Sequence, residues 1–164
     1  MPNFYRALTV ILLTASACAS SDPFVGTWIL NQKRSVYPAG SCPKSMIISM
    51  EATGKGIRYS SNTVFANGST AHSQYEADYN GREVIVTGNR GMLLPVSLKR
   101  AGPRTVIAYY TRGSQITASS RRVVSQDGHW MRITTKSKDL RGKSVTVVGV
   151  YEKKFNPVVS LTQK

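Results

Sequence analysis

The chain has 164 residues and a formal net charge of +14, from 22 lysines and arginines against 8 aspartates and glutamates. This length provides one domain with a sizeable core, and no repeat or shift in composition indicates a second. Two cysteines without a Cys-x-x-Cys spacing exclude a cysteine-based metal site. The positive charge would attract the protein to anionic surfaces. The basic residues are scattered along the chain, however, which is typical of a solvated face.

The first 23 residues indicate an export segment and a tether. Residues 7–17 form an apolar run that is shorter than the roughly 20 residues of a membrane span. We therefore predict a signal peptide over residues 1–17, with a buried first helix as the alternative, and a short tether over residues 18–23. The protein is expected to be exported, and so to be periplasmic, anchored to the outer membrane through Cys18, or secreted.

Two ways of processing this segment fit the residues. Ala15-Ser16-Ala17-Cys18 resembles the lipobox of bacterial lipoproteins, which implies lipidation of Cys18, whereas Ala17-Cys18-Ala19 fits ordinary signal-peptidase cleavage. We favour lipidation. Cys42 is then unpaired, as it is if cleavage removes Cys18. If both cysteines remain in an oxidising compartment, a Cys18–Cys42 disulfide is the alternative.

From residue 24 onward, short β-rich runs alternate with turn residues, and no long segment has helical spacing. The loop at residues 32–44 contains two prolines, Asn80-Gly81 predicts a two-residue hairpin, and Pro95 places its strand at an edge or a bulge. The predicted strands cover residues 24–31, 45–52, 57–65, 69–79, 82–88, 92–99, 104–111, 115–125, 129–137 and 143–154.

About ten strands at this spacing suit a barrel or a sandwich, and closure into a barrel removes exposed edges. We predict a single all-β domain over residues 24–154, an antiparallel up-and-down β-barrel of about ten strands, with eight as the alternative count. Residues 155–164 would form a C-terminal tail.

Both ends of this domain resemble calycins. The segment Phe24-Val25-Gly26-Thr27-Trp28-Ile29-Leu30 is similar to the F-x-G-x-W-x-L first strand of lipocalins and cellular fatty-acid-binding proteins. Residues 147–154 resemble the last strand of fatty-acid-binding proteins, which ends R-x-Y-x-K. The whole pattern resembles exported bacterial lipocalin-like proteins, and it implies a ligand-binding barrel. Residues 32–44 are too short for the helical lid of fatty-acid-binding proteins, so we expect an open or loop-capped mouth.

In such a barrel, every second side chain of each strand points inward. The candidate ligand-binding residues, each with a simple core role as the alternative, are Trp28, Tyr59, Tyr75, Tyr109, Arg122, Met131 and Tyr151.

The resemblance implies that Tyr151 would hold a ligand carboxylate together with an arginine two residues earlier. That position is Gly149, so half of the clamp is missing. The family also has a second arginine on an earlier strand, and Arg121 or Arg122 lies in that neighbourhood. We favour Arg122, which shares a strand face with Ile116, Ala118 and Val124.

No catalytic or metal-binding constellation is recognisable. The sequence lacks H-E-x-x-H and G-x-S-x-G, and the polar row from His72 to Asp78 is typical of a solvent-facing stripe. We therefore predict a non-enzymatic barrel, without cofactor or metal, that binds a small apolar or amphipathic molecule.

The alternative is a structural or adhesive envelope protein whose basic exterior binds an anionic membrane or polysaccharide surface. Nucleic acid is not an expected partner of an exported protein. The hints of a nucleic-acid site are basic residues next to aromatic ones, in Arg58-Tyr59 and Tyr109-Tyr110-Thr111-Arg112.

Overall fold

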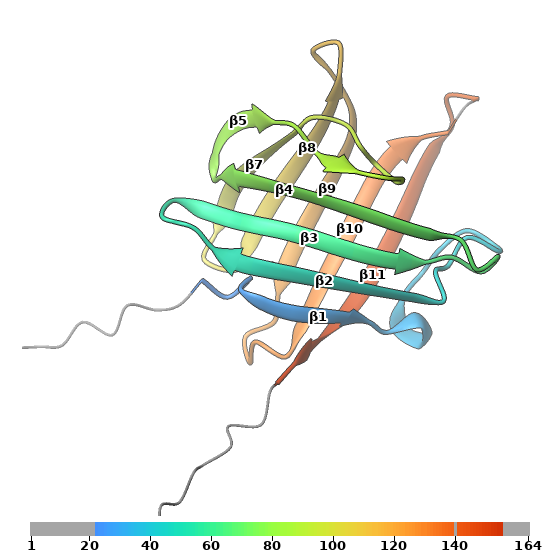
Figure 1. The fold of residues 1–164 in the computed structure, drawn as a ribbon, viewed down its shortest axis with the longest axis horizontal. Coiled ribbons are helices and arrows are strands. Elements are labelled where there is room, and N and C mark those ends of the chain that lie inside the picture. The colour runs from blue at the N-terminus through green and yellow to red at the C-terminus, as the bar shows by residue number, and fades with distance from the viewer. Residues whose placement is uncertain (1–21, 140, 156–164) are drawn as a thin grey trace, which may run out of the picture.

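The computed structural model describes residues 22–139 and 141–155, so the predicted signal peptide, Cys18 and residues 156–164 lie outside the described residues. The described residues form one antiparallel sheet of 11 strands (Figure 1). The elements are β1 (Gly26–Leu30), η1 (Gln32–Arg34), β2 (Ser45–Ala52), β3 (Gly56–Val64), β4 (Thr70–Asp78), β5 (Asn80–Val84), β6 (Thr87–Gly88), β7 (Val96–Gly102), β8 (Thr105–Arg112), β9 (Gln115–Val124), β10 (Trp130–Lys138) and β11 (Ser144–Lys154).

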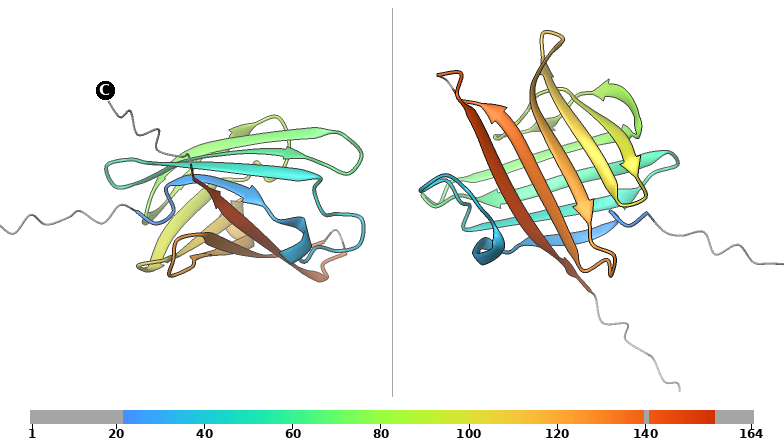
Figure 2. Two further views of the ribbon diagram at one scale, coloured as in Figure 1. Left: turned by 90° about the horizontal axis from the view of Figure 1, so that it is seen from below. Right: turned by 180° about the vertical axis from the view of Figure 1, so that it is seen from behind.

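The sheet curls on itself, with the strand order β5-β7-β8-β9-β10-β11-β1-β2-β3-β4-β6. β1 pairs with both β2 and β11, which brings the first and last strands side by side. In Figure 2, the half made of β1–β4 faces the half made of β7–β11 across the interior. The predicted all-β antiparallel barrel is confirmed, with a loop and the three-residue η1 after β1 in place of a helical lid.

The pairing of β5 and β6 corrects one local prediction. We expected Asn80-Gly81 to fold residues 82–88 back onto the preceding strand, but β5 pairs with β7 and β6 pairs with β4. Only Ile85 and Val86 lie between β5 and β6, so this short span crosses from one edge of the sheet to the other. Val86 is buried and Ile85 is exposed, as alternation requires.

Pro95 also acts differently from the expectation. It immediately precedes β7, and its carbonyl accepts a hydrogen bond from the Thr111 amide. The strand begins at Val96 rather than at residue 92, and Pro95, which has no N–H to donate to the ladder, lies just before its first residue. β7 pairs with strands on both sides instead of forming an edge.

One end of the barrel is filled by apolar side chains. Trp28 is fully buried there, and its indole Nε1 donates a hydrogen bond to the Phe24 carbonyl at 2.8 Å. The Lys153 Nζ lies 5.1 Å from the Trp28 ring centroid, and a Cβ at Gly26 would lie 2.6 Å from Lys153 Cε. Trp28 thus has the core role given as the alternative to ligand binding and plugs this end of the barrel, and Gly26 leaves room for the Lys153 side chain.

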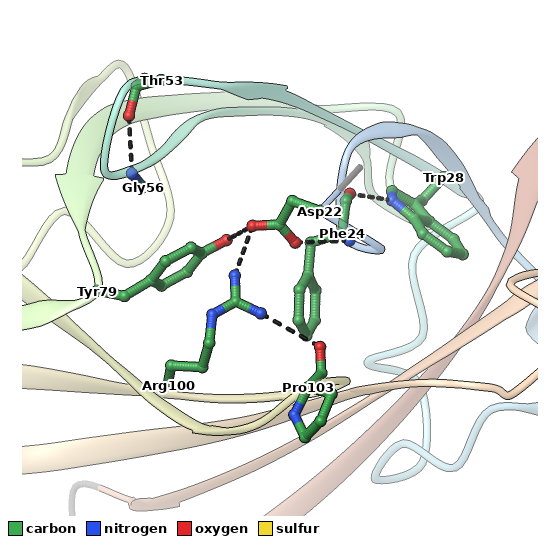
Figure 3. Close-up of polar contacts among 8 residues, drawn as sticks. All are labelled: Asp22, Phe24, Trp28, Thr53, Gly56, Tyr79, Arg100 and Pro103. Atoms are coloured by element: carbon green, nitrogen blue, oxygen red, sulfur yellow. Dashed lines mark hydrogen bonds and ion pairs between the residues drawn. The ribbon is translucent and has the colours of Figure 1, made fainter. Parts of the chain in front are cut away.

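The segment before β1 is tied across this filled end (Figure 3). Asp22 accepts hydrogen bonds from the Phe24 amide at 3.1 Å and the Tyr79 hydroxyl at 2.7 Å, and it forms an ion pair with Arg100 at 2.5 Å. Burial and the bond to Asp22 raise the pKa of Tyr79. These polar contacts of Asp22 with Phe24, Tyr79 and Arg100, which we call the latch, close the filled end together with the apolar packing.

Over the described ranges, no helix combines the length and the apolar composition that a membrane span requires.

Candidate functional site

A cavity of about 270 Å³ lies inside the barrel, away from the Trp28 plug, and is bordered by loop residues that include Tyr37, Phe65 and Arg90. Its walls come from β2, β3, β4, β8, β9, β10 and β11. The aromatic part of the wall consists of Phe65 and five tyrosines, Tyr37, Tyr59, Tyr75, Tyr110 and Tyr151.

Tyr59 and Tyr75 form one side of this wall. They are directly opposite each other on β3 and β4, and their rings stack with centroids 4.8 Å apart and planes inclined by 12°. Both are buried. Burial raises the pKa of each phenol, while the positive charge of Arg122 acts in the opposite direction. These tyrosines are therefore neutral groups facing a cation.

Arg122 projects from β9 into the cavity and is only 2% exposed. Its Nη2 donates to the Tyr110 hydroxyl at 3.3 Å, and its guanidinium carbon lies 5.0 Å from the Tyr59 ring centroid. The Nε and Nη1 of Arg122 and the hydroxyl of Tyr75 have no hydrogen-bond partner among the described residues. Buried polar groups are normally paired, so these orphaned atoms make this part of the cavity the candidate site for a polar ligand group.

The cavity supplies no counter-charge to Arg122. All eight carboxylate residues lie within the described ranges, and none of them lines the cavity. Burial opposes the charge on Arg122, whereas the tyrosine hydroxyls, that of Tyr75 first among them, favour it, and the net direction of its pKa is upward. The guanidinium therefore stays charged, since arginine is not deprotonated in proteins.

Small hydroxyl side chains contribute polar groups to the rest of the wall. Ser61 and Ser73 are hydrogen-bonded at 2.9 Å between β3 and β4, and Ser120 and Thr135 at 2.7 Å between β9 and β10. These hydroxyls satisfy one another, so the Arg122 region is the part of the cavity with unused donors.

Four predicted site residues come together here: Tyr59, Tyr75, Arg122 and Tyr151 all line the cavity. Arg122 shares the buried face of β9 with Ala118 and Val124, as its parity predicts. Its neighbour Arg121 is exposed on the outer face.

The structure places three predicted site residues elsewhere. Trp28 and Met131 are fully buried in the apolar core and do not line the cavity. The inward placement of Tyr109 is wrong, because Tyr110 faces the buried Ala118 while Tyr109 faces Ser119 on the outer side. Ile116 is 63% exposed, since a register shift next to Thr111 interrupts the alternation.

Sequence reasoning missed Tyr110 and Tyr37. The signal for Tyr110 is its pairing with Ala118, which shares a face with Arg122, but this pairing follows only from the β8–β9 register. Tyr37 lies in the loop after η1, where no strand periodicity indicates its direction.

Tyr151 explains the missing half of the clamp that the resemblance implied. A Cβ at Gly149 would lie 2.7 Å from Tyr151 Cε2, so the ring occupies the space that a side chain at position 149 would need. The Tyr151 hydroxyl donates to the Met46 sulfur at 3.3 Å. A side chain at position 149 would therefore displace the Tyr151 ring, and the buried arginine of this cavity comes from β9 instead.

The polar row on β4 is solvent-facing, as predicted: Gln74 and Glu76 are exposed, while Tyr75 and Ala77 are buried. Within residues 22–139 and 141–155, no group of three or more His, Cys, Asp or Glu residues is placed to hold a metal ion.

No protein-family profile matches the sequence, and comparison with curated proteins finds no match. Solved structures similar in fold include the following two. The zebrafish ileal bile acid-binding protein, in complex with cholic acid, is 10% identical, with a TM-score of 0.51 over 80% of this chain and 99% of that one. Rv2717c from M. tuberculosis is 13% identical, with a TM-score of 0.50 over 81% and 94%. These likenesses confirm the calycin-like fold.

Proposed function

We propose that this protein binds a small amphipathic molecule that carries one acidic group, and that Arg122 holds this group inside the barrel. A single observation carries the proposal: Arg122 is buried and charged, two of its nitrogens have no partner among the described residues, and no carboxylate lines its cavity. A bound anion would supply the missing counter-charge.

The energetics favour such a ligand. A buried unpaired charge is costly, because it loses its hydration without a compensating partner. An acidic group beside Arg122 would accept from Nε and Nη1, and hydrogen bonds to charged groups contribute on the order of 1.5–3 kcal/mol each. The Tyr75 hydroxyl, which also has no partner among the described residues, would be a third donor.

The cavity limits the size of the ligand. Its volume of about 270 Å³ lies just below the range of roughly 300–1,000 Å³ that is usual for ligand pockets. Tyrosine rings and the apolar side chains of Val86 and Ile133 would contact the uncharged part of the ligand. Cholic acid, bound to the zebrafish protein, is also an amphipathic acid, which supports the class of ligand without identifying it.

The proposal places this binding outside the cytoplasm and does not include catalysis. The apolar run at residues 7–17 and Cys18 support export, although they lie outside the described residues.

A matched pair of dyes tests the proposal. Anilinonaphthalene sulfonate and N-phenylnaphthylamine share the same ring system, but only the first carries an acidic group. Arg122→Met retains much of the apolar stem and should weaken the sulfonate at least about tenfold, since about 1.4 kcal/mol corresponds to one decade. The affinity of this variant for the neutral dye should stay within about twofold of that of the parent protein, because this dye makes no charged contact.

Arg121→Met is the control, because it removes the same charge from the outer face. It should change neither affinity. The proposal is wrong if the parent binds neither dye saturably, or if Arg122→Met weakens both dyes equally while the protein remains folded.

A further inference from the structure

The outer face of β9 and β10, away from the cavity, carries a run of basic side chains. Arg121 on β9 and Arg132, Lys136 and Lys138 on β10 are all exposed. These strands lie side by side on the face seen from behind in Figure 2. The inward neighbours of these residues, such as Arg122 and Met131, are buried, so the two faces are chemically separate.

The strand register arranges these charges as a line. Thr134 lies directly opposite Arg121, so Arg121 fills the gap between Arg132 and Lys136 along β10. One basic side chain is therefore present at each outward level from residue 132 to residue 138. Successive outward levels are about 6.6 Å apart, because each residue of a strand advances about 3.3 Å.

A groove of about 470 Å³ begins this line. Its lining includes the basic residues Arg34, Arg121 and Arg132, together with Trp130, Val123 and Val150. The guanidinium carbon of Arg34 lies 4.0 Å from the Trp130 ring centroid, so Arg34 reaches from η1 across β11 to β10. We call the set Arg34, Arg132, Arg121, Lys136 and Lys138 the basic track.

No ion pair among the described residues involves the basic track. In the three ion pairs of the described residues, the basic partner is Arg58 or Arg100. Glu152, next to Trp130 on β11, accepts a hydrogen bond from Asn31. The other outward positions that flank Lys136 carry hydroxyls, Ser119 on β9 and Thr146 on β11.

We infer that the basic track binds an extended anionic polysaccharide, with its acidic groups on the track and its hydroxyls on the flanking serine and threonine side chains. Charge complementarity selects a polyanion, and the linear spacing selects an extended chain over a compact anion. A nucleic-acid strand would need several free aromatic platforms for its bases, whereas the one aromatic ring of the groove, Trp130, is already covered by Arg34. This site is independent of the cavity and of the function proposed for it.

Binding of polygalacturonate oligomers of graded length tests the inference. Affinity should rise with oligomer length and level off near the span of the track, about 26 Å from residue 130 to residue 138 at about 3.3 Å per residue. It should fall steeply with salt, because the contacts are exposed charges. Arg121→Ser with Lys136→Ser should weaken binding at least about tenfold, or about 1.4 kcal/mol.

Lys55→Ser with Arg104→Ser is the matched control. It removes the same charge from exposed turn residues off the track, and should change the affinity by less than about twofold. Equal loss in both double variants would overturn the inference, because net charge alone would then explain binding. Absence of binding by the parent at low salt, or tighter track-dependent binding of a single-stranded oligonucleotide or of anionic vesicles, would also overturn it.

Discussion

Arg122 and Tyr110 lie on neighbouring strands but are not opposite each other. Arg122 is paired with Val106, and Tyr110 with Ala118, yet the Arg122 Nη2 donates to the Tyr110 hydroxyl at 3.3 Å. The arginine side chain therefore extends along β9 within the barrel instead of straight across it. Tyr110 thus holds the guanidinium in the cavity, while Nε and Nη1 have no partner among the described residues.

Tyr110→Phe should weaken binding of anilinonaphthalene sulfonate by about two- to tenfold, because it removes one hydroxyl worth about 0.5–1.5 kcal/mol from the site. Tyr109→Phe, on the outer face, should leave the affinity unchanged. Fluorescence titration of both variants measures the difference. A larger effect of Tyr109→Phe would contradict the β8–β9 register.

Arg122→Met should raise the stability of the ligand-free protein while it lowers affinity for the acidic dye. The substitution removes a buried charge without a carboxylate partner and replaces it with an apolar chain. Replacing even paired buried charges with apolar groups is often stabilising by about 1–4 kcal/mol. Urea unfolding should therefore show a higher midpoint, with Arg121→Met unchanged as the control. A loss of stability on Arg122→Met would mean that the tyrosine contacts already compensate the charge.

The protein should lose stability steeply above about pH 10, the ordinary pKa of tyrosine. Burial raises the pKa of five tyrosines, so they remain protonated in the folded state at a pH where the unfolded chain ionises: Tyr37, Tyr59, Tyr75, Tyr79 and Tyr151. Below that pH both states are protonated, and the contribution of these groups is fully present. Above it, each such tyrosine costs about 1.4 kcal/mol per pH unit until its folded pKa is reached.

Lys153 acts in the opposite direction, because burial lowers its pKa, but it is one group against five. Unfolding free energies measured in urea from neutral pH to pH 12, with tyrosinate absorbance followed in parallel, check this prediction. Tyr59→Phe should reduce the fall of the unfolding free energy with pH by roughly 1.4 kcal/mol per pH unit, because one fewer tyrosine then releases a proton on unfolding. Constant stability over this range would contradict it.

Asp22→Ala should destabilise the filled end of the barrel by about 2 kcal/mol, since Asp22 receives three hydrogen bonds and two of their donors, Tyr79 and Arg100, lose a charged acceptor. The Asp22 and Arg100 side chains are only 17% and 32% exposed. Glu51→Ala is the control, because the Glu51–Arg58 pair is 69% and 61% exposed. Exposed pairs contribute about 0–1 kcal/mol. Equal losses in urea unfolding would show that the latch adds nothing beyond a surface pair.

Gly88→Ala should release β6 from β4. A Cβ at Gly88 would lie 2.0 Å from the His72 carbonyl oxygen, and that atom belongs to the backbone. Because β6 pairs with β4 at only two positions, its detachment should speed hydrogen exchange at residues 86–89 and quicken entry of the dye. Gly54→Ala, where a Cβ would meet nothing within 4 Å, should change neither rate. Unchanged exchange in Gly88→Ala would contradict this role of β6.

The alternation of side chains along single strands could be interpreted from the sequence alone. The strand predicted over residues 45–52 has the bounds of β2, and the parity of residues 118–124 places Arg122 inside. Both features depend on the local two-residue period of an extended chain. The inward direction of Trp28 was likewise predicted from one short segment, but its place in the core instead of the cavity was not.

Relations between strands were decided only by the tertiary structure. A strand's own residues do not specify its partner, so the span from β5 to β6 and the choice of Tyr110 over Tyr109 depend on long-range register. The absence of a carboxylate near Arg122, in the described part of the chain, is also a property of assembled walls. The sequence by itself favoured Arg122 over Arg121 as the inward arginine, and only the packing of the strands around it decided that its charge is buried without a partner among the described residues.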